Sequence, residues 1–139
     1  MSKKIKYKII SSDSRGTMMN IFDHNVQNVT FLSSNANSIR SNHYHINDWH
    51  YIYILKGKID YFYGNIDCEL DELKYLSLNK GECVFTPNNE FHTTFFPVDT
   101  EILVFNNQSR DQDTYENDLV RRDLVTQNNI HKLIEKFNV

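Results

Sequence analysis

The feature that most constrains this chain is a succession of short runs that are rich in Ile, Val, Tyr, Phe and Thr. Such residues suit the pleated, half-buried surface of a β-strand. The runs cover residues 29–32, 49–55, 59–63, 74–78, 82–85, 92–96 and 101–105, and charged and apolar residues alternate before them over residues 4–10. Turn residues such as Lys56-Gly57 separate the runs. Many short strands without intervening helical periods predict an all-β sandwich, barrel or jelly roll.

Only the C-terminal end of the chain shows a helical period. Apolar residues stand there at positions i, i+3, i+4 and i+7, which predicts a short α-helix over about residues 128–137. These residues are Ile130, Leu133, Ile134 and Phe137. Asn128 or Asn129 is the expected cap at its start. We expect this helix to cover a sheet edge or to pack on a partner subunit.

Residues 108–123 hold five acidic residues and three arginines without a clear period, so we expect a solvated loop there. No repeat, linker or low-complexity tract divides the chain, and 139 residues fit one domain. We therefore predict a single domain over residues 1–139, with a barrel core over about residues 29–106.

Composition excludes several classes of protein. A net charge of −3 gives no basic footprint for nucleic acid. Two cysteines, Cys68 and Cys83, make no disulfide framework, so we expect buried reduced thiols. No apolar stretch approaches the ~20 residues of a membrane span. The N-terminus lacks the apolar run of a secretory signal, so the expected location is the cytoplasm.

The histidines carry the strongest functional signal. His43 and His45 lie two residues apart, so on a β-strand both side chains point to the same face. His50 opens the next predicted strand, and His92 begins a later one. If the strands close around a barrel, the four rings converge on one cavity. His24 lies outside this pattern, as does His131, and we expect both on the surface.

Imidazole is the commonest protein ligand for metals near neutral pH. A single histidine in a strand is more often a surface or hydrogen-bonded residue, and one H-x-H pair is weak evidence for a metal. The four together predict a divalent metal, either Zn, Fe, Mn, Ni or Cu, and no organic cofactor. The predicted metal ligands are His43, His45, His50 and His92.

Two segments resemble the motifs of the cupin superfamily. The first cupin motif is H-x-H, a spacer, an acidic residue, six more residues and Gly, and His43, His45, His50 and Gly57 reproduce this spacing. The second motif, G-x5-P-x-G-x2-H, is met by Gly81, Pro87 and His92. The resemblance implies an all-β double-stranded β-helix, the cupin jelly roll, here with a short C-terminal α-helix.

The departures from these motifs concern four positions. Asn37 and Asn89 stand where cupins usually have glycine, and Asn is the residue after Gly that best tolerates a left-handed backbone. His50 replaces the usual glutamate, which removes an anionic ligand and leaves a site of four neutral histidines. Phe96 replaces an Asn that often follows the second motif, so one polar group is missing.

Shorter matches narrow the resemblance to small cupins of nucleotide-sugar biosynthesis. Residues 13–16, Asp-Ser-Arg-Gly, look like the Asp-x-Arg-Gly opening of dTDP-4-dehydrorhamnose 3,5-epimerases and dTDP-sugar 3,4-ketoisomerases. Residues 40–45 are similar to their Arg-Gly-x-His-x-His segment, and residues 109–121 resemble their closing strand. The resemblance implies a nucleotide-sugar substrate, polysaccharide biosynthesis and a homodimer. In the ketoisomerases a histidine pair transfers protons without a metal, which carries over to His43 and His45.

Proton transfer next to a sugar ketone needs a base and a group that stabilises the developing enolate. We expect His43 or His45 as the base and Arg40 as the ligand of a phosphate or of the enolate oxygen. Five strand tyrosines could supply a phenol as second proton donor or stack on the substrate, although packing alone also explains a strand tyrosine. We select Tyr53 as the catalytic phenol and Tyr61 and Tyr63 as substrate-binding residues.

Three functions remain open on the sequence. The first is an enzyme that epimerises or keto-isomerises a 4-keto-deoxy nucleotide sugar by histidine-mediated proton transfer. The second is a metal-dependent cupin oxygenase or lyase with a four-histidine site that acts on a small polar molecule. The third is a non-catalytic sugar-binding module. A bound cation remains compatible with sugar isomerisation, because it would polarise a carbonyl.

Overall fold

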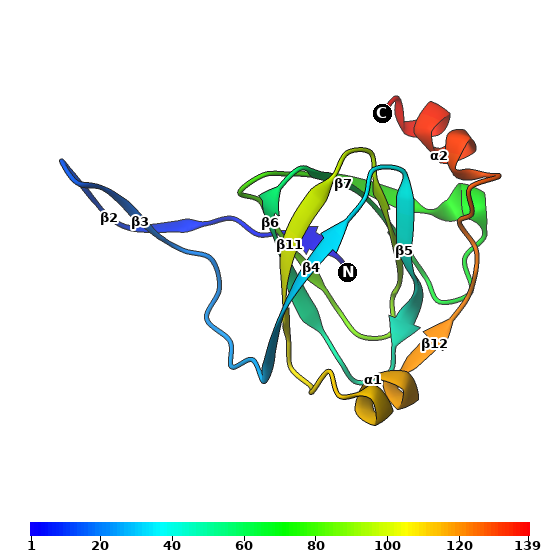
Figure 1. Ribbon diagram of the computed structural model, residues 1–139, viewed down its shortest axis with the longest axis horizontal. Helices are drawn as coiled ribbons and strands as arrows, with labels where there is room; N and C mark the ends of the chain where they lie inside the picture. The colour runs from blue at the N-terminus through cyan, green and yellow to red at the C-terminus, as the bar shows by residue number, and fades with distance from the viewer.

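Two five-stranded antiparallel sheets face each other and enclose a core (Figure 1). The first sheet has the strand order β1-β9-β6-β11-β4, and the second has the order β12-β5-β10-β7-β8. The computed structural model describes all residues from 1 to 139. This architecture confirms the predicted all-β jelly roll.

The element bounds follow the predicted runs closely between residues 28 and 106, except that residues 38–45 form a strand that the predicted runs do not include. The strands are β1 (Lys3–Lys4), β2 (Lys8–Asp13), β3 (Gly16–Asn20), β4 (Asn28–Ser34), β5 (Ser38–His45), β6 (His50–Lys56), β7 (Lys58–Gly64), β8 (Lys74–Asn79), β9 (Cys83–Thr86), β10 (Phe91–Phe96), β11 (Thr100–Asn106) and β12 (Leu119–Arg121). The helices are α1 (Gln112–Asp118), α2 (Ile130–Phe137) and the 3-10 turn η1 (Leu70–Glu72).

The core lies between the two sheets. In β6 and β11 the residues that alternate inward are apolar, for example Ile52, Ile54, Ile102 and Val104, and all four are buried in one cluster. Because the side-chain period of a strand is two, the residues between them point to the outer face of the first sheet. One end of this space stays open and becomes the cavity described below.

Helix α2 covers the outer face of the second sheet. Leu133 of α2 packs in one buried cluster with Phe62 of β7 and Phe91 of β10. The predicted C-terminal helix is thereby confirmed. Asn129 stands at its start, but its side chain accepts a hydrogen bond from the Thr126 N–H, not from the helix. No helix in the structure combines the length and the apolar character that crossing a bilayer requires.

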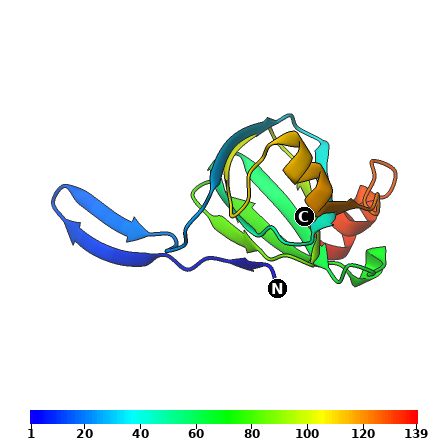
Figure 2. The same ribbon diagram turned by 90° about the horizontal axis from the view of Figure 1, so that it is seen from below.

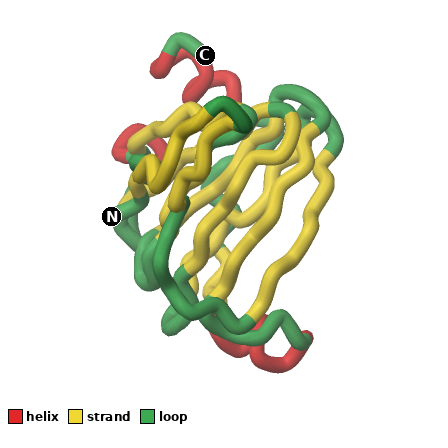
Figure 3. The backbone as a smooth tube through the Cα atoms, turned by 90° about the vertical axis from the view of Figure 1, so that its left-hand side faces the viewer, coloured by secondary structure: helices red, strands yellow, loops and turns green.

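The prediction of a loop over residues 108–123 is wrong, because α1 and β12 lie there. Asp111 caps α1 by accepting a hydrogen bond from the Thr114 N–H at 3.1 Å. Seven helical residues and three strand residues are too few to display a period in the sequence. Figure 2 shows α1 across the lower opening of the barrel, and Figure 3 shows helices at both ends of the strands.

Two asparagines occupy the left-handed turns at which cupins usually have glycine. Asn37 has φ 71° and Asn89 has φ 55°. Both asparagines therefore have the left-handed backbone that we predicted for them.

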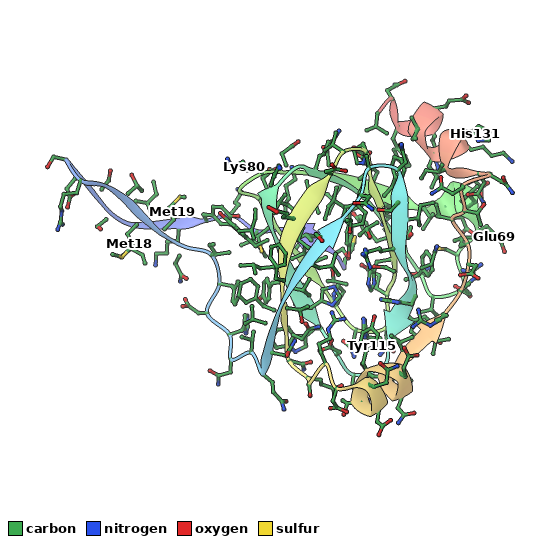
Figure 4. The ribbon with its side chains drawn as sticks, viewed as in Figure 1. Met18, Met19, Glu69, Lys80, Tyr115 and His131 are labelled. Carbon is green, nitrogen blue, oxygen red and sulfur yellow. The ribbon has the colours of Figure 1, made fainter.

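The hairpin of β2 and β3, which we call the arm, projects away from the barrel (Figures 1 and 2). The run predicted over residues 4–10 is split, because Lys3–Lys4 pair with β9 whereas Lys8–Asp13 belong to the arm. Met18 and Met19 lie along the arm, between its tip and the barrel (Figure 4).

Candidate active site

Four histidine rings meet inside the barrel. His43 and His45 come from β5, His50 from β6 and His92 from β10, and all four are buried. The ring centroids of His43 and His45 are 4.8 Å apart, as are those of His43 and His92. The His50 ring is 5.5 Å from that of His45 and 5.3 Å from that of His92. Both sheets therefore contribute to one cluster.

A β-bulge sets the direction of the His43 side chain. His92 is paired with His43, whereas Thr93 is already paired with Ser41, so Asn42 is the extra residue of β5. Ser41 has φ 71° and Asn42 has φ 56°, the left-handed geometry that such a bulge needs. The Asn42 side chain holds this geometry through hydrogen bonds with the backbone O and N–H of Val125.

The histidines are uncharged at neutral pH. Burial is the main cause that lowers the pKa of each ring, and the neighbouring rings lower it further for His43, His50 and His92. The pKa of His92 falls to about 3. The His92 Nδ1 lies 3.3 Å from the backbone O of Glu90, so Nδ1 carries the hydrogen and Nε2 presents a lone pair to the cluster.

Two buried carboxylates flank His45. Its Nδ1 lies 3.4 Å from Asp118 Oδ2 and 4.0 Å from Asp48 Oδ2. Asp118 also accepts the backbone N–H groups of Asn47 and Asp48, each at 2.9 Å, which fixes its position. A carboxylate at Nδ1 orients an imidazole and stabilises its protonated form. His45 is therefore the ring of the cluster best prepared to accept a proton.

A polar chain links these carboxylates to the floor of the site. Asp48 accepts a hydrogen bond from the Asn106 side chain at 2.7 Å, and Asn106 accepts one from Arg110 at 3.1 Å. The Arg110 guanidinium lies 4.6 Å from the ring centroid of Tyr115. The Tyr115 ring in turn lies 6.1 Å from the His45 ring. Tyr115 projects from α1 at the lower end of the barrel (Figure 4).

The cluster opens into a cavity of about 450 Å³. This size lies within the range of about 300–1,000 Å³ that is usual for small-molecule sites. Three arginines, Arg40, Arg110 and Arg121, line it together with apolar side chains such as Ile52 and Phe96. Arg40 is anchored to β4, because it donates hydrogen bonds to Ser34 Oγ and to the backbone O of Ser33.

The three selected tyrosines do not line this cavity. Tyr53 is half-buried on the outer face of the first sheet, opposite Leu103 and Cys83, so its selection as the catalytic phenol is corrected. Tyr61 and Tyr63 point into the core, where the Tyr61 hydroxyl is hydrogen-bonded to Thr86 and Ser2. Their selection as substrate-binding residues is corrected as well. Tyr53 fails because alternate residues of a strand face opposite sides, whereas Tyr61 and Tyr63 face inward but are packed into the core beside the cavity.

Most of the cavity and site residues that we did not predict lie in residues 108–123, the segment predicted to be a loop. Arg110, Tyr115, Asp118 and Arg121 all lie between residues 108 and 123. Their one visible signal was the concentration of acidic residues and arginines in a short stretch. Asp48 was missed because it lies in the connection between β5 and β6, which carries no strand pattern.

The histidine cluster also fits a metal ion. One ring nitrogen from each of His43, His45 and His92 can lie within 4.8 Å of the others. Buried ring nitrogens without a hydrogen-bond partner occur in all four histidines, which is unusual for buried polar atoms. A neutral nitrogen set of this kind suits Zn, Cu, Fe or Ni.

The chain is similar to known proteins in its fold but not in its sequence. No protein-family model matches it, and no curated protein matches its sequence. The sugar 3,4-ketoisomerase QdtA from Thermoanaerobacterium thermosaccharolyticum, solved with TDP, is 19% identical with a TM-score of 0.68, and 88% of each chain is covered. WlaRA, a TDP-fucose-3,4-ketoisomerase from Campylobacter jejuni, is 16% identical with a TM-score of 0.68, covering 87% of this chain and 89% of its own.

A third solved structure extends the likeness to an epimerase. The rmlC epimerase of Mycobacterium tuberculosis is 14% identical with a TM-score of 0.66, covering 86% of this chain and 68% of its own. The expected resemblance to nucleotide-sugar cupins is thus matched in three dimensions. The chain has the jelly-roll fold that these ketoisomerases and this epimerase share.

Proposed function

We propose that this protein epimerises or keto-isomerises a 4-keto-deoxy nucleotide sugar by proton transfer at histidine. One observation carries the proposal: the buried, uncharged His45, with its Nδ1 3.4 Å from Asp118, belongs to a cluster that opens into a cavity lined by three arginines. The base, its orienting carboxylate and the anion-binding groups are thus in one place.

The base acts on the carbon next to the sugar ketone. His45 Nδ1 directs its hydrogen toward Asp118, so Nε2 is the atom that accepts the proton. As the ring becomes charged, the carboxylates of Asp118 and Asp48 stabilise the imidazolium. In keto-isomerisation the same ring then gives this proton to the former ketone carbon, while the hydroxyl proton on the carbon that lost it passes to the former ketone oxygen. His43, whose ring centroid is 4.8 Å away, is the second ring available to the substrate.

The phenol that complements this base is Tyr115. It lines the cavity, and Arg110 lies over its ring. Arg110 packs over this ring and holds it at the cavity, where its hydroxyl can donate a proton to the enolate oxygen or to the opposite face of the sugar. Tyr115 takes the part that we expected of Tyr53.

The lining of the cavity matches a nucleotide sugar. Arg40, Arg110 and Arg121 offer guanidinium groups, the side chain best suited to phosphate oxygens. The apolar wall suits the methyl group of a deoxy sugar. The solved QdtA complexes, one with TDP and one with TDP-4-keto-6-deoxyglucose, support a substrate of this class.

The test is solvent exchange on a defined substrate. The protein is incubated with TDP-4-keto-6-deoxyglucose in D2O, and deuterium next to the ketone is followed by NMR. We expect exchange with the native protein, and a loss of about 10²–10⁴-fold in His45→Asn. Tyr115→Phe should slow turnover, whereas Tyr53→Phe, which lies outside the cavity, should not. A panel of 4-keto nucleotide sugars that bind without exchange would instead support a sugar-binding module.

A metal-dependent oxygenase or lyase is the second candidate, and we propose it because of the unpartnered ring nitrogens. His43, His45, His50 and His92 would hold the metal, which would supply Lewis-acid or redox chemistry to a small polar substrate. Elemental analysis of protein purified without chelators tests it. One equivalent of Zn, Fe, Mn, Ni or Cu, lost in His92→Ala but retained in the exposed control His131→Ala, would support the metal site. Metal-free native protein would contradict it.

The resemblance to nucleotide-sugar cupins also supports a cytoplasmic homodimer, and we include both in the proposal. Sugar nucleotides are the substrates of cytoplasmic biosynthesis. Fractionation of cells that express the tagged chain tests the location, and sedimentation of the full chain tests the homodimer, which should have twice the chain mass of 16.5 kDa.

A further inference from the structure

The three arginines that line the cavity differ in what they already bind. Arg40 donates two hydrogen bonds to β4 through its Nε and Nη2. Arg121 forms an ion pair with Glu116 at 2.9 Å. Arg110 donates only its Nε, to Asn106 Oδ1 at 3.1 Å, and no carboxylate lies within ion-pair distance of it. Both Nη groups of Arg110 therefore lack a protein partner and are free to bind a substrate.

The Asn106 side chain fixes the position of the Arg110 guanidinium. Asn106 is 0% exposed, and its amide donates a hydrogen bond to Asp48 Oδ2 at 2.7 Å. Because Asn106 is bonded at both its nitrogen and its oxygen, it cannot rotate without the loss of a buried hydrogen bond. The ring of Tyr115, 4.6 Å from the guanidinium carbon, supports Arg110 from a second side. Arg110 is therefore oriented before a substrate arrives, which is what the stabilisation of a developing charge requires.

The histidine cluster lies between Arg40 and Arg110. Along β5, Arg40 comes first and is followed by His43 and His45. Leu119, the residue directly after α1, is paired with His45, so α1 lies beyond the His45 end of the cluster. Arg110 contacts α1 and shares this end. After burial, the positive charge of Arg110 is one of the causes that lower the pKa of all four rings, as its position beside them requires.

Exposure separates the arginines in the same way. Arg40 and Arg121 are exposed, and the Arg121 side chain is 57% accessible, whereas Arg110 is half-buried. In a 4-keto nucleotide sugar the diphosphate is attached to the anomeric carbon, and the ketone lies across the ring from it. The nucleoside extends beyond the diphosphate, so the diphosphate needs an opening to solvent, whereas the ketone must lie beside the base. The exposed arginines suit the first group and Arg110 suits the second.

We propose that Arg110 binds the ketone oxygen of the sugar and stabilises the enolate, whereas Arg40 and Arg121 bind the diphosphate. This assignment rests on the proposed function. As His45 Nε2 takes the proton from the carbon next to the ketone, the electrons of the broken C–H bond form a C=C bond, and the electron pair of the carbonyl moves to its oxygen. The Nη–H groups of Arg110 donate hydrogen bonds to this oxygen, and these strengthen as the negative charge develops. Tyr115 then donates its proton to the oxygen and, in keto-isomerisation, regains one from the hydroxyl group of the neighbouring carbon.

The test separates turnover from nucleotide binding. Turnover of TDP-4-keto-6-deoxyglucose at saturation and the affinity for TDP, measured by calorimetry, are compared in variants of the full chain. Arg110→Ala should lower kcat by about 10²–10³-fold, the usual loss for one donor to an oxyanion. It should keep the affinity for TDP, which also shows that the variant is folded. Arg40→Ala should instead weaken TDP binding by about 10–100-fold and keep kcat at saturation.

Arg122→Ala is the matched control. Arg122 follows Arg121 in the chain but does not line the cavity, and it donates a hydrogen bond to the backbone O of Ile66. Its removal should change neither kcat nor the affinity for TDP. If Arg110→Ala does not fold, Arg110→Gln, which keeps a donor for Asn106, is measured in its place and should show the same loss of kcat.

Two results would overturn the assignment of Arg110 while the proposed function stands. One is native turnover with an Arg110 variant that binds TDP weakly but keeps kcat at saturation, because Arg110 would then bind the diphosphate. The other is an Arg110 variant that keeps both quantities. A native protein that causes no exchange or turnover with any 4-keto nucleotide sugar would instead overturn the proposed function, and the assignment with it.

Discussion

Replacing Gly57 by Ala tests the packing of the turn that joins the two sheets. Gly57 links β6 of the first sheet to β7 of the second, with φ +90°. A Cβ built there would lie 2.5 Å from the backbone O of Asp99, 2.5 Å from Thr100 Oγ1 and 2.8 Å from Thr100 Cα. Two of these three atoms belong to the backbone, so no rotamer change relieves the contact.

The size of the effect follows from two costs. A left-handed backbone costs a residue with a Cβ about 1–2 kcal/mol. Forcing an extra carbon against a packed backbone adds about 1–3 kcal/mol. Gly57→Ala should therefore lower the free energy of unfolding by about 2–5 kcal/mol, a large part of the 5–15 kcal/mol typical of a domain.

Gly81→Ala is the matched control. Gly81 also has a positive φ, +84°, but nothing lies within 4 Å of a Cβ there. Gly81→Ala should lower the free energy of unfolding only by the backbone cost of about 1–2 kcal/mol. Urea unfolding compares the free energies of unfolding of the two variants, provided that their m-values are equal. If both variants lost the same free energy of unfolding, the reasoning would be refuted, because the contacts with Asp99 and Thr100 would then not destabilise Gly57→Ala.

Three further predictions concern the turns, the carboxylate and the pH dependence. Asn37→Ala should cost about 1 kcal/mol in urea unfolding, whereas Asn37→Gly should be neutral, because the position has φ 71°. Asp118→Asn should lower stability by about 1–3 kcal/mol in thermal unfolding, because an amide keeps one acceptor for two backbone N–H groups. Burial lowers the pKa of His50 and brings that of His92 to about 3, whereas a histidine of the unfolded chain has a pKa of about 6.5. As the pH falls below about 6.5, the unfolded chain therefore binds protons that the folded chain does not, and the folded state loses stability. Chelator-treated protein should therefore keep full stability above pH 6.5 and lose about 1 kcal/mol per histidine at pH 5.5 in urea titrations. A flat pH profile would contradict this last prediction.

The barrel was accessible from the sequence because its signals are local. Runs of β-branched and aromatic residues between turn residues predicted the strands from β4 to β11 except β5, for which the two-residue spacing of His43 and His45 was the only signal. The spacing of His43, His45, His50 and His92 depends only on strand period and turn position, so their common location followed from the jelly roll.

The remainder of the site was not accessible because it depends on contacts distant in the sequence. The Asp118 side chain accepts hydrogen bonds from the backbone N–H groups of Asn47 and Asp48, about 70 residues earlier in the chain. No local sequence pattern predicts a contact over that distance. Alternation along a strand shows that only some of the tyrosines can face inward, but it does not show which ones. It also cannot show that the inward-facing Tyr61 is packed in the core, with its hydroxyl bonded to Ser2 and Thr86, instead of lining the cavity.

The long separation between Asp118 and the β5–β6 connection has a consequence for synthesis. All four histidines leave the ribosome before Asp118 does, since chains emerge from the N-terminus. The barrel strands β4 to β11 can therefore pair while the carboxylate that orients His45 is still untranslated. Docking of α1 and β12 therefore follows the emergence of the barrel strands, and α2 emerges later still. A nascent chain that ends before α1 would hold the four histidines without the carboxylate that orients His45.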